Sequence, residues 1–274
     1  MPLELAFSSC PNDTFMFNAI VSGAVPVAWP LGVRIGDIEE LNQWAFAGET
    51  DITKLSFFAY FQLADQYVML NSGAALGRGC GPVIISRRPI PEDELKNMRV
   101  AVPGLNTTAF LLFKTYCPKC TKLVPMLFSE IEQAIITGDV DAGVIIHETR
   151  FTYQLRGLQK LVDLGEWWEG TTGHPIPLGC IAIKRDMAVD VGTEFERALK
   201  SSVEHAFSNR GDAYPFIRKH AKELDQDVID AHIDLYVNDF SISLGDAGQK
   251  AVRHLYRAAY RAGLVKSLRN DIFL

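Results

Sequence analysis

Residues 138–142 read Gly-Asp-Val-Asp-Ala, and residues 48–52 read Gly-Glu-Thr-Asp-Ile. In each run a glycine that can end a helix in a left-handed turn stands three residues before an aspartate that opens a strand. The same joint between a helix and a strand therefore occurs twice. This repeat, with halves of roughly 45 residues, predicts two similar α/β units.

The order of elements around the two joints is also similar. In the first unit we predict the strand Leu3–Ser8, the helix Thr14–Val21 ending at Gly23, the helix Ile38–Ala47 and the strand Asp51–Phe58. In the second we predict the strand Arg99–Val102, the helices Ala109–Tyr116 and Ile131–Thr137, and the strand Ala142–Ile146. We expect Ser129 and Glu132 to form a capping box at the second of these helices.

Two further apolar segments, Val83–Ser86 and Gly179–Lys184, each follow a turn-rich segment, and we interpret them as hinge strands. Lobe one would then contain residues 1–87 and 180–274, and lobe two residues 88–179. Helical spacing predicts C-terminal helices over Glu194–Phe207, Tyr214–Glu223, Val228–Val237 and Gly245–Ala262, with Gly263 as the final stop. The expected fold is α/β, with two lobes, two hinge strands and a central cleft.

The composition excludes several classes of protein. Of the 274 residues, 48% are hydrophobic and 22% are charged, which is ordinary for a globular protein with a sizeable core. The net charge is −6 and no run of basic residues is longer than the pair Arg87-Arg88, so a nucleic-acid or anionic-membrane surface has no electrostatic basis. We therefore expect a small-molecule partner, while the oligomeric state stays open.

The expected location is the cytoplasm. The first residues lack a basic leader, and no apolar run approaches the roughly 20 residues that cross a bilayer. Five scattered cysteines do not suggest a disulfide framework and suit a reducing compartment.

Four polar segments stand where predicted strands end, and ligands of open α/β sheets bind at the carboxyl ends of strands. They are Ser8–Thr14, Lys54-Leu55-Ser56, Pro103–Ala109 and His147-Glu148. We expect these segments to line the cleft.

Pro103–Ala109 leads from a turn into a helix, so its free N–H groups and the hydroxyls of Thr107 and Thr108 can hold a carboxylate. The alternative is that Thr107 only caps the helix, and the two roles are compatible.

His147 ends the apolar strand and would project into the cleft, where a neutral imidazole can accept a proton near pH 7. The alternative is a histidine held at a strand end for structural reasons. Glu148 and Arg150 either orient this ring or form an exposed ion pair of little energetic value.

Lys54 and Ser56 are predicted on the opposite wall, where they would act as donors to a developing oxyanion. Asn12, Asp13 and Thr14 begin the first helix, so capping explains them as well as substrate contact does. Gly81 and Pro82 belong to a tight loop beside the hinge that would either face the ligand or simply turn the chain.

Other signals favour ordinary structural roles. Cys117 and Cys120 have zinc-like spacing without a second pair, so we interpret them as ordinary thiols and expect no metal site. No dinucleotide or phosphate-loop glycine pattern occurs, so no cofactor is implied. We interpret His205, His220, His232 and His254 as surface or packing residues. Trp167, Trp168 and Tyr236 serve either the core or an aromatic substrate, and His174 is a candidate for the cleft rim.

Five motifs, taken in order, resemble a known family. They are Ser9-Cys10-Pro11-Asn12-Asp13-Thr14-Phe15, Thr53-Lys54-Leu55-Ser56, Gly77-Arg78-Gly79-Cys80-Gly81-Pro82, Pro103-Gly104 with Thr107-Thr108-Ala109, and Ile145-Ile146-His147-Glu148. From residue 4 to about residue 260 the chain is similar to the 1,4-dihydroxy-6-naphthoate synthases of the futalosine route to menaquinone. These enzymes convert cyclic dehypoxanthinyl futalosine into 1,4-dihydroxy-6-naphthoate.

The resemblance implies a type II periplasmic-binding-protein fold used for catalysis inside the cell. It implies a lyase reaction in which His147 abstracts a proton, the sugar-derived ring opens and a carbon–carbon bond breaks. It also implies that Lys54, Leu55 and Ser56 line one side of the substrate, and Thr108 and Ala109 the other. We interpret Cys10 and Cys80 within these motifs as small space fillers that the reaction does not need.

Two other functions compete with this one. A chorismate dehydratase of the same pathway would share the fold but eliminate water. A non-catalytic cytoplasmic protein that binds a small carboxylate would need the cleft without the base.

Overall fold

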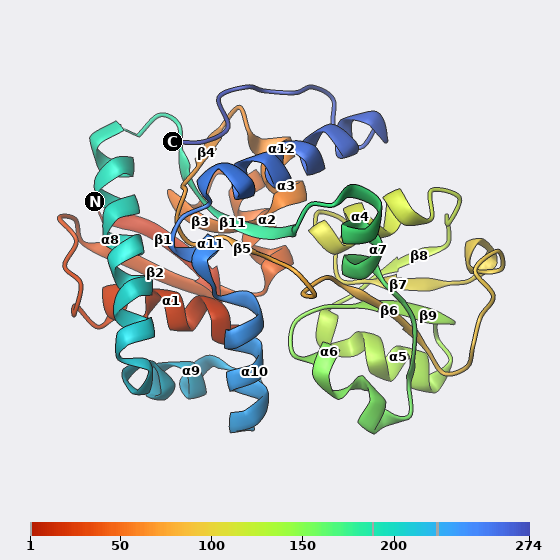
Figure 1. Ribbon diagram of the computed structural model, residues 1–274. Helices are drawn as coiled ribbons and strands as arrows, with labels where there is room; N and C mark the ends of the chain where they lie inside the picture. Colours follow the sequence, from red (N-terminus) through yellow and green to blue (C-terminus); the bar gives the residue numbers. More distant parts are fainter. Residues whose placement is uncertain (1, 188, 223–224) are drawn as a thin grey trace.

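The computed structural model describes residues 2–187, 189–222 and 225–274. Its elements form two halves, each with a sheet flanked by helices (Figure 1). Within the described ranges, no helix is both long enough and apolar enough to cross a membrane.

The sheet of the first half has the order β2-β1-β3-β11-β4, and β5 also pairs with β11. Its strands are β1 (Leu3–Ser8), β2 (Leu31–Gly36), β3 (Ile52–Ser56), β4 (Tyr67–Met69), β5 (Ala75–Gly77) and β11 (Ile176–Lys184). β1 runs parallel to β2 and β3, whereas β11 is antiparallel to β3, β4 and β5. The carboxyl ends of β1 and β3 therefore lie at the same edge of this sheet.

Helices cover both faces of the first sheet (Figure 1). They are α1 (Pro11–Val21), α2 (Ile38–Phe46), α3 (Phe57–Leu63), α8 (Val189–Ser208), α9 (Tyr214–His220), α10 (Gln226–Tyr236), α11 (Asp239–Ile242) and α12 (Gly245–Arg261). α1 packs against α8, α9 and α10, and their apolar side chains form one buried cluster with those of β1. α12 packs against α3 and β11.

The sheet of the second half has the order β10-β6-β9-β7-β8. Its strands are β6 (Val83–Ser86), β7 (Val100–Val102), β8 (Leu123–Pro125), β9 (Ala142–Ile145) and β10 (Gln159–Asp163), and its helices are α4 (Thr108–Tyr116), α5 (Ile131–Thr137), α6 (Thr149–Thr152) and α7 (Leu164–Thr172). β7 runs parallel to β8 and β9, and β6 is antiparallel to β9 and β10. Two α/β units are therefore confirmed, each with three parallel strands next to an antiparallel strand.

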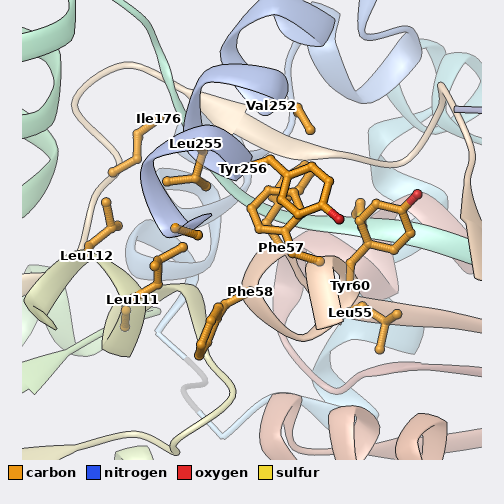
Figure 2. Packing of buried hydrophobic residues seen from close by; sticks show 14 of the residues in the cluster. Leu55, Phe57, Phe58, Tyr60, Leu111, Leu112, Ile176, Val252, Leu255 and Tyr256 are labelled. Atoms are coloured by element: carbon orange, nitrogen blue, oxygen red, sulfur yellow. The ribbon is translucent and has the colours of Figure 1, made fainter. Parts of the chain in front are cut away.

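A continuous hydrophobic cluster joins the two halves (Figure 2). It contains Phe58 of α3, Leu111 and Leu112 of α4, and Leu255 of α12, all of them buried. Phe58 stacks on Phe110 with 5.9 Å between ring centroids. This contact fixes the start of α4 against the first half and so helps to position the space between the two sheets.

Several predicted boundaries differ from the structure. β3 ends at Ser56, and the apolar residues that follow it begin α3 rather than continuing the strand. The capping box at Ser129 is wrong, because the helix is preceded by a 3₁₀ turn over Phe128–Glu130 and Glu130 occupies the N-cap without a side-chain bond. Gly138 does end this helix in the left-handed conformation, with φ of 85°.

The strand Val83–Ser86 is formed, but it lies inside the second sheet between β9 and β10. The chain thus passes to the second half just before β6, and it returns to the first half near the start of β11 (Figure 1). The C-terminal helices are confirmed with shifted ends, and Glu223, the predicted end of one, lies outside the described residues.

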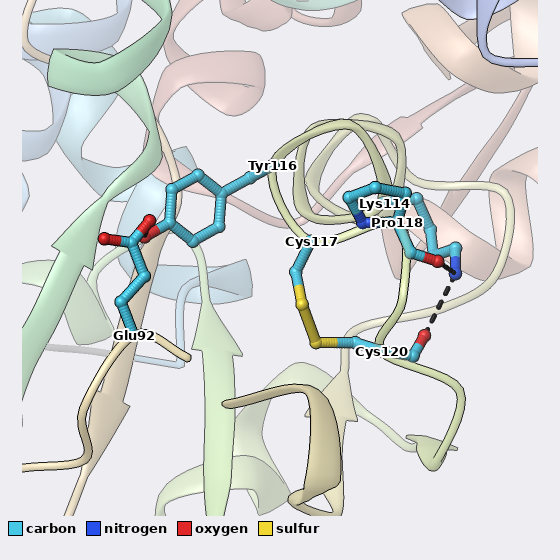
Figure 3. The surroundings of a disulfide bond; sticks show 6 residues. All are labelled: Glu92, Lys114, Tyr116, Cys117, Pro118 and Cys120. Atoms are coloured by element: carbon cyan, nitrogen blue, oxygen red, sulfur yellow. Dashed lines mark hydrogen bonds between the residues drawn. A yellow bond between two sulfur atoms is a disulfide. The ribbon is translucent and has the colours of Figure 1, made fainter. Parts of the chain in front are cut away.

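The interpretation of Cys117 and Cys120 as ordinary thiols is wrong, because the structure joins them in a disulfide (Figure 3). The peptide between them turns tightly after α4, and Lys114 Nζ donates to the carbonyls of Pro118 and Cys120, at 3.0 Å each. Cys10, Cys80 and Cys180 are free and buried.

Candidate active site

A cavity lies where the two halves meet, and both contribute to its wall. From the first half come residues at the ends of β1 and β3 and on α1 and α10, and from the second residues at the start of α4 and after β9. Its lining consists of Ser8, Asn12, Asp13, Ile38, Lys54, Ser56, Ala75, Cys80, Pro82, Thr107, Thr108, Ala109, Ile146, His147, Leu178, Gly179, His232 and Tyr236.

His147 lines this cavity immediately after β9. Its φ of 59° is the only positive value at a non-glycine position among the described residues. Such a backbone costs of order 1–3 kcal/mol and occurs preferentially at functional sites. The turn directs the chain from the strand into α6 and sets the direction in which the imidazole leaves the sheet.

The ring of His147 has defined neighbours. Its Nδ1 lies 3.2 Å from Cys10 Sγ, across the gap between the halves. Phe128 and His232 flank it, with ring centroids at 4.8 Å and 6.2 Å. Nε2 is buried and has no hydrogen-bond partner among the described residues.

The thiol of Cys10 is not a simple space filler, because it contacts the candidate base. Burial, reinforced by the negative charges of Glu148 and Asp13, raises the pKa of Cys10 well above its ordinary value. The sulfur therefore stays protonated at neutral pH.

A buried polar chain forms the opposite wall. Lys54 Nζ donates to Asp13 Oδ1 at 2.8 Å, and both side chains are almost fully buried. Asn12 Nδ2 donates to the same Asp13 oxygen at 2.8 Å, and Asn12 Oδ1 lies 3.0 Å from His232 Nε2. The chain thus extends from β3 through the start of α1 to α10.

His232 was assigned from sequence to the surface or to packing, yet it lines the cavity and is only 1% exposed. Because Asn12 directs its amide nitrogen to Asp13, its oxygen must accept from His232, so the His232 proton is on Nε2. Nδ1 then carries a lone pair, and it has no partner among the described residues. Burial, with the nearby His147 and Lys54, lowers the pKa of His232 well below its ordinary value, so this ring is neutral.

The start of α4 supplies the third wall. Thr107 is the N-cap, accepting a hydrogen bond from the Phe110 N–H at 3.1 Å, so the capping role is confirmed. The hydroxyl of Thr108 donates to the Leu178 carbonyl at 2.6 Å, which ties α4 to β11. The N-terminus of α4 therefore faces the cavity and presents its positive end to it.

Some predicted residues do not line the cavity. Leu55 packs in the hydrophobic core, and the hydroxyl of Thr14 donates to the Cys10 carbonyl at 3.0 Å. The Gly81 carbonyl accepts a hydrogen bond from Arg150 Nη1, and Arg150 Nη2 lies 2.7 Å from Asp163 Oδ2. Arg150 and Glu148 thus do not form an exposed ion pair, and Glu148 is only 8% exposed.

The remaining candidate residues divide between the core and the cavity. Tyr236 and Cys80 line the cavity, and burial raises the pKa of the Cys80 thiol to about 12. Trp168 is buried against His254, and Trp167 packs on Tyr116. His174 packs on His254, with 4.7 Å between ring centroids, and is not part of the cavity lining.

Solved structures with the same arrangement define the fold. A protein from Archaeoglobus fulgidus superposes with a TM-score of 0.91 at 37% identity, covering 96% of this chain and 98% of that one. The alkanesulfonate-binding protein of Xanthomonas axonopodis gives 0.71 at 15% identity, covering 97% and 94%. The two-lobed α/β fold is thus that of periplasmic binding proteins.

The sequence comparisons are more specific. A Thermus thermophilus protein named 1,4-dihydroxy-6-naphtoate synthase is 43% identical over 272 residues, which are 99% of this chain and 99% of the relative. A Streptomyces coelicolor protein of the same name is 43% identical over 274 residues, covering 98% and 96%. The family model described as menaquinone biosynthesis matches residues 3–261. The chain therefore belongs to this menaquinone biosynthesis family.

Proposed function

We propose that the protein is a 1,4-dihydroxy-6-naphthoate synthase, a carbon–carbon lyase that acts on cyclic dehypoxanthinyl futalosine. Two relatives with this name match nearly the whole chain at 43% identity. A chorismate dehydratase is not favoured, because the relatives carry the other name. Action in the cytoplasm, as expected of a biosynthetic enzyme, is part of the same proposal.

The observation that carries the chemical part concerns His147, which lines the cavity: its Nε2 has no hydrogen-bond partner in the part of the chain that the structure describes. A neutral imidazole can act as a base only at the nitrogen without a proton. Our proposal places the proton on Nδ1, which lies 3.2 Å from Cys10 Sγ. In this tautomer Nε2 carries the lone pair that accepts a proton from carbon.

The imidazolium that forms is stabilised by a neighbouring charge. Carboxylate, thiol and ring donor atoms of Glu148, Cys10 and His147 all lie within 4.8 Å of one another. In this proposal the carboxylate of Glu148 stabilises the positive charge that develops on the ring during proton transfer. Glu148 is then a positioning residue for His147.

The substrate is proposed to lie between the two other walls. Its carboxylate is held at the N-terminus of α4, where Thr107 caps the helix and the positive end of the helix dipole attracts an anion. Ser56 and Lys54 face it from β3, with the charge of Lys54 partly balanced by Asp13. These donors stabilise the oxyanion that forms when His147 removes the proton beside the ketone.

The remaining steps start from the enolate that forms when the proton beside the ketone is removed. The sugar-derived ring opens, a carbon–carbon bond breaks, and a small polyol-type fragment leaves as the naphthoate becomes aromatic. The contact between the halves excludes water while this occurs.

Incubation of the protein with cyclic dehypoxanthinyl futalosine tests the function. We expect conversion to 1,4-dihydroxy-6-naphthoate, followed by its ultraviolet absorption and chromatographic retention, with no consumption of chorismate in a parallel reaction. A ligand-binding protein would return the futalosine unchanged, and consumption of chorismate would favour the dehydratase. Either outcome would refute the proposal.

A further inference from the structure

Three different metal-ligating side chains meet beside the cavity. Donor atoms of Cys10, His147 and Glu148 all lie within 4.8 Å of one another, and Cys10 Sγ is 3.2 Å from His147 Nδ1. Cys10 comes from the loop between β1 and α1, whereas His147 and Glu148 follow β9. The cluster thus spans the two halves of the molecule.

One member of the cluster is a buried acceptor without a partner. Glu148 is 8% exposed, and its Oε2 has no hydrogen-bond partner among the described residues. Burying an unpaired carboxylate oxygen is costly, and such groups in proteins are normally paired or bound to a cation. The nearby Arg150 does not serve this purpose, because its guanidinium is bonded to Asp163 and to the Gly81 carbonyl.

The donor set selects a class of cation. One sulfur, one nitrogen and one carboxylate oxygen suit Zn²⁺ and Co²⁺, whereas Mg²⁺ and Ca²⁺ prefer oxygen ligands alone. In a tetrahedral zinc site with ordinary bond lengths, donor atoms lie about 3.5 Å apart. Movements on the order of 1 Å would therefore bring these three side chains to that geometry.

The geometry points to a binding site for a Zn²⁺-class cation formed by Cys10, His147 and Glu148. The cation displaces the proton of the Cys10 thiol, which is released to solvent. Three protein ligands leave the fourth position open for water or a ligand. The bound ion links the two halves through Cys10 on one side and His147 and Glu148 on the other. The ion also binds the imidazole of His147, which the proposed reaction uses as a base. A ring that holds the ion at one nitrogen and a proton at the other cannot accept a further proton, so the cation acts as an inhibitor.

Binding of Co²⁺ to the full-length protein tests the site directly, without reference to any reaction. The measurement is made in the Cys117→Ser/Cys120→Ser background, so that reduction of that disulfide supplies no competing thiols. We expect one Co²⁺ per chain and a near-ultraviolet band that requires a cobalt–thiolate bond. Added Zn²⁺ should abolish the band, and Mg²⁺ should leave it unchanged.

Cys10→Ser is the decisive variant and Cys80→Ser its control, because Cys80 is also a free cysteine beside the cavity but lies outside the cluster. We expect loss of the thiolate band in Cys10→Ser and its retention in Cys80→Ser. Glu148→Gln, which keeps the size of the side chain, should weaken Co²⁺ binding by at least about tenfold. Circular dichroism and urea unfolding establish that each variant is folded.

If Cys10→Ser does not fold, the loss of Co²⁺ affinity in His147→Ala and Glu148→Gln carries the test. No thiolate band in the parent protein would overturn the inference, as would a band that survives in Cys10→Ser or affinity unchanged in Glu148→Gln. None of these readings depends on turnover, so failure of the proposed reaction and failure of this site are separate outcomes.

Discussion

At the scale of single residues, Asp13 organises the wall of the site that faces His147. Its carboxylate accepts hydrogen bonds from the Ser8 N–H and hydroxyl, from Asn12 Nδ2 and from Lys54 Nζ. Both side chains are almost fully buried, and Asp13 supplies the counter-charge of the Lys54 ammonium. The pair therefore positions Lys54 at the cavity rather than acting as a surface ion pair.

Replacing Asp13 by Asn leaves the buried ammonium of Lys54 without a counter-charge. We expect Asp13→Asn to lower the free energy of unfolding by about 3–5 kcal/mol in urea titrations. The matched control is Glu49→Gln in the exposed pair Arg34–Glu49, which joins atoms 3.1 Å apart and should cost less than about 1 kcal/mol. Equal effects of the two substitutions would contradict this account of Asp13.

His232 gives the protein a defined response to acid. Its folded pKa is depressed, so the unfolded chain takes up a proton at a higher pH than the folded chain does. The stability that a neutral His232 provides is complete above its unfolded pKa of about 6.5 and is lost as pH falls from there toward the folded pKa.

The variant His232→Gln removes this titration while an amide N–H can still donate to Asn12 Oδ1. We expect the wild-type protein to lose up to about 1.4 kcal/mol more unfolding free energy per pH unit below about pH 6.5 than the variant loses. Urea titrations at about pH 7.5 and about pH 5.5 measure the difference. Parallel pH dependence in the two proteins would show that His232 is not a buried neutral residue.

At the scale of elements, the entry to β6 and the start of α7 touch backbone to backbone. A Cβ added to Gly81 would lie 2.3 Å from Gly165 Cα. Asp163, which accepts from the N–H groups of Gly165 and Glu166, caps α7 and binds Arg150 at the same place. This close approach of the two backbones explains why residue 81 is a glycine.

We expect Gly81→Ala to destabilise the protein by about 1–3 kcal/mol or more, because backbone on both sides must move. The control is Gly170→Ala in α7, the helix that Gly81 contacts, because a Cβ added at Gly170 would meet no atom within 4 Å. That substitution should raise stability by about 0.4–1 kcal/mol by restricting the unfolded chain. Thermal unfolding measures the stabilities of the two variants. A Gly81→Ala variant as stable as the wild-type protein would argue against the contact between Gly81 and Gly165.

Most elements could be predicted where a local signal marks their ends. Gly48 and Gly138 end helices with positive φ, and Thr107 caps α4, as their residue types suggest. The strand predicted across residues 51–58 failed at its end because α3 is buried on nearly every side, and such a run has no helical periodicity. The capping box at Ser129 failed because the local 3₁₀ turn shifted the helix start by one residue.

At the scale of the whole molecule, the two halves are joined at the site itself. Asn106 Nδ2 donates to Glu39 Oε1 at 2.8 Å, and Cys10 meets His147 at 3.2 Å across the same gap. The hydroxyl of Thr108 and the ring of Phe110 hold α4 to the first half. These contacts hold the two halves together around the cavity.

The same long-range contacts explain what sequence reasoning missed. His147 follows a recognisable strand, Lys54 lies near the end of β3, and the start of α4 follows a turn, so their convergence is predictable from the rule for strand ends. His232 lies on an amphipathic helix 220 residues from Asn12, and nothing in its local pattern marks its contact with the cavity. The pairing of Cys10 with His147 likewise joins residues 137 positions apart.

The most direct test compares turnover and ligand affinity in His147→Asn, which keeps a polar side chain of similar reach at the end of β9. Because the base contributes about 10²–10⁴-fold to the rate, kcat with cyclic dehypoxanthinyl futalosine should fall by that factor. The Kd for 1,4-dihydroxy-6-naphthoate should change little, because we propose that the other walls hold this ligand. A variant that binds the naphthoate normally and retains full kcat would contradict the role of His147 as the base.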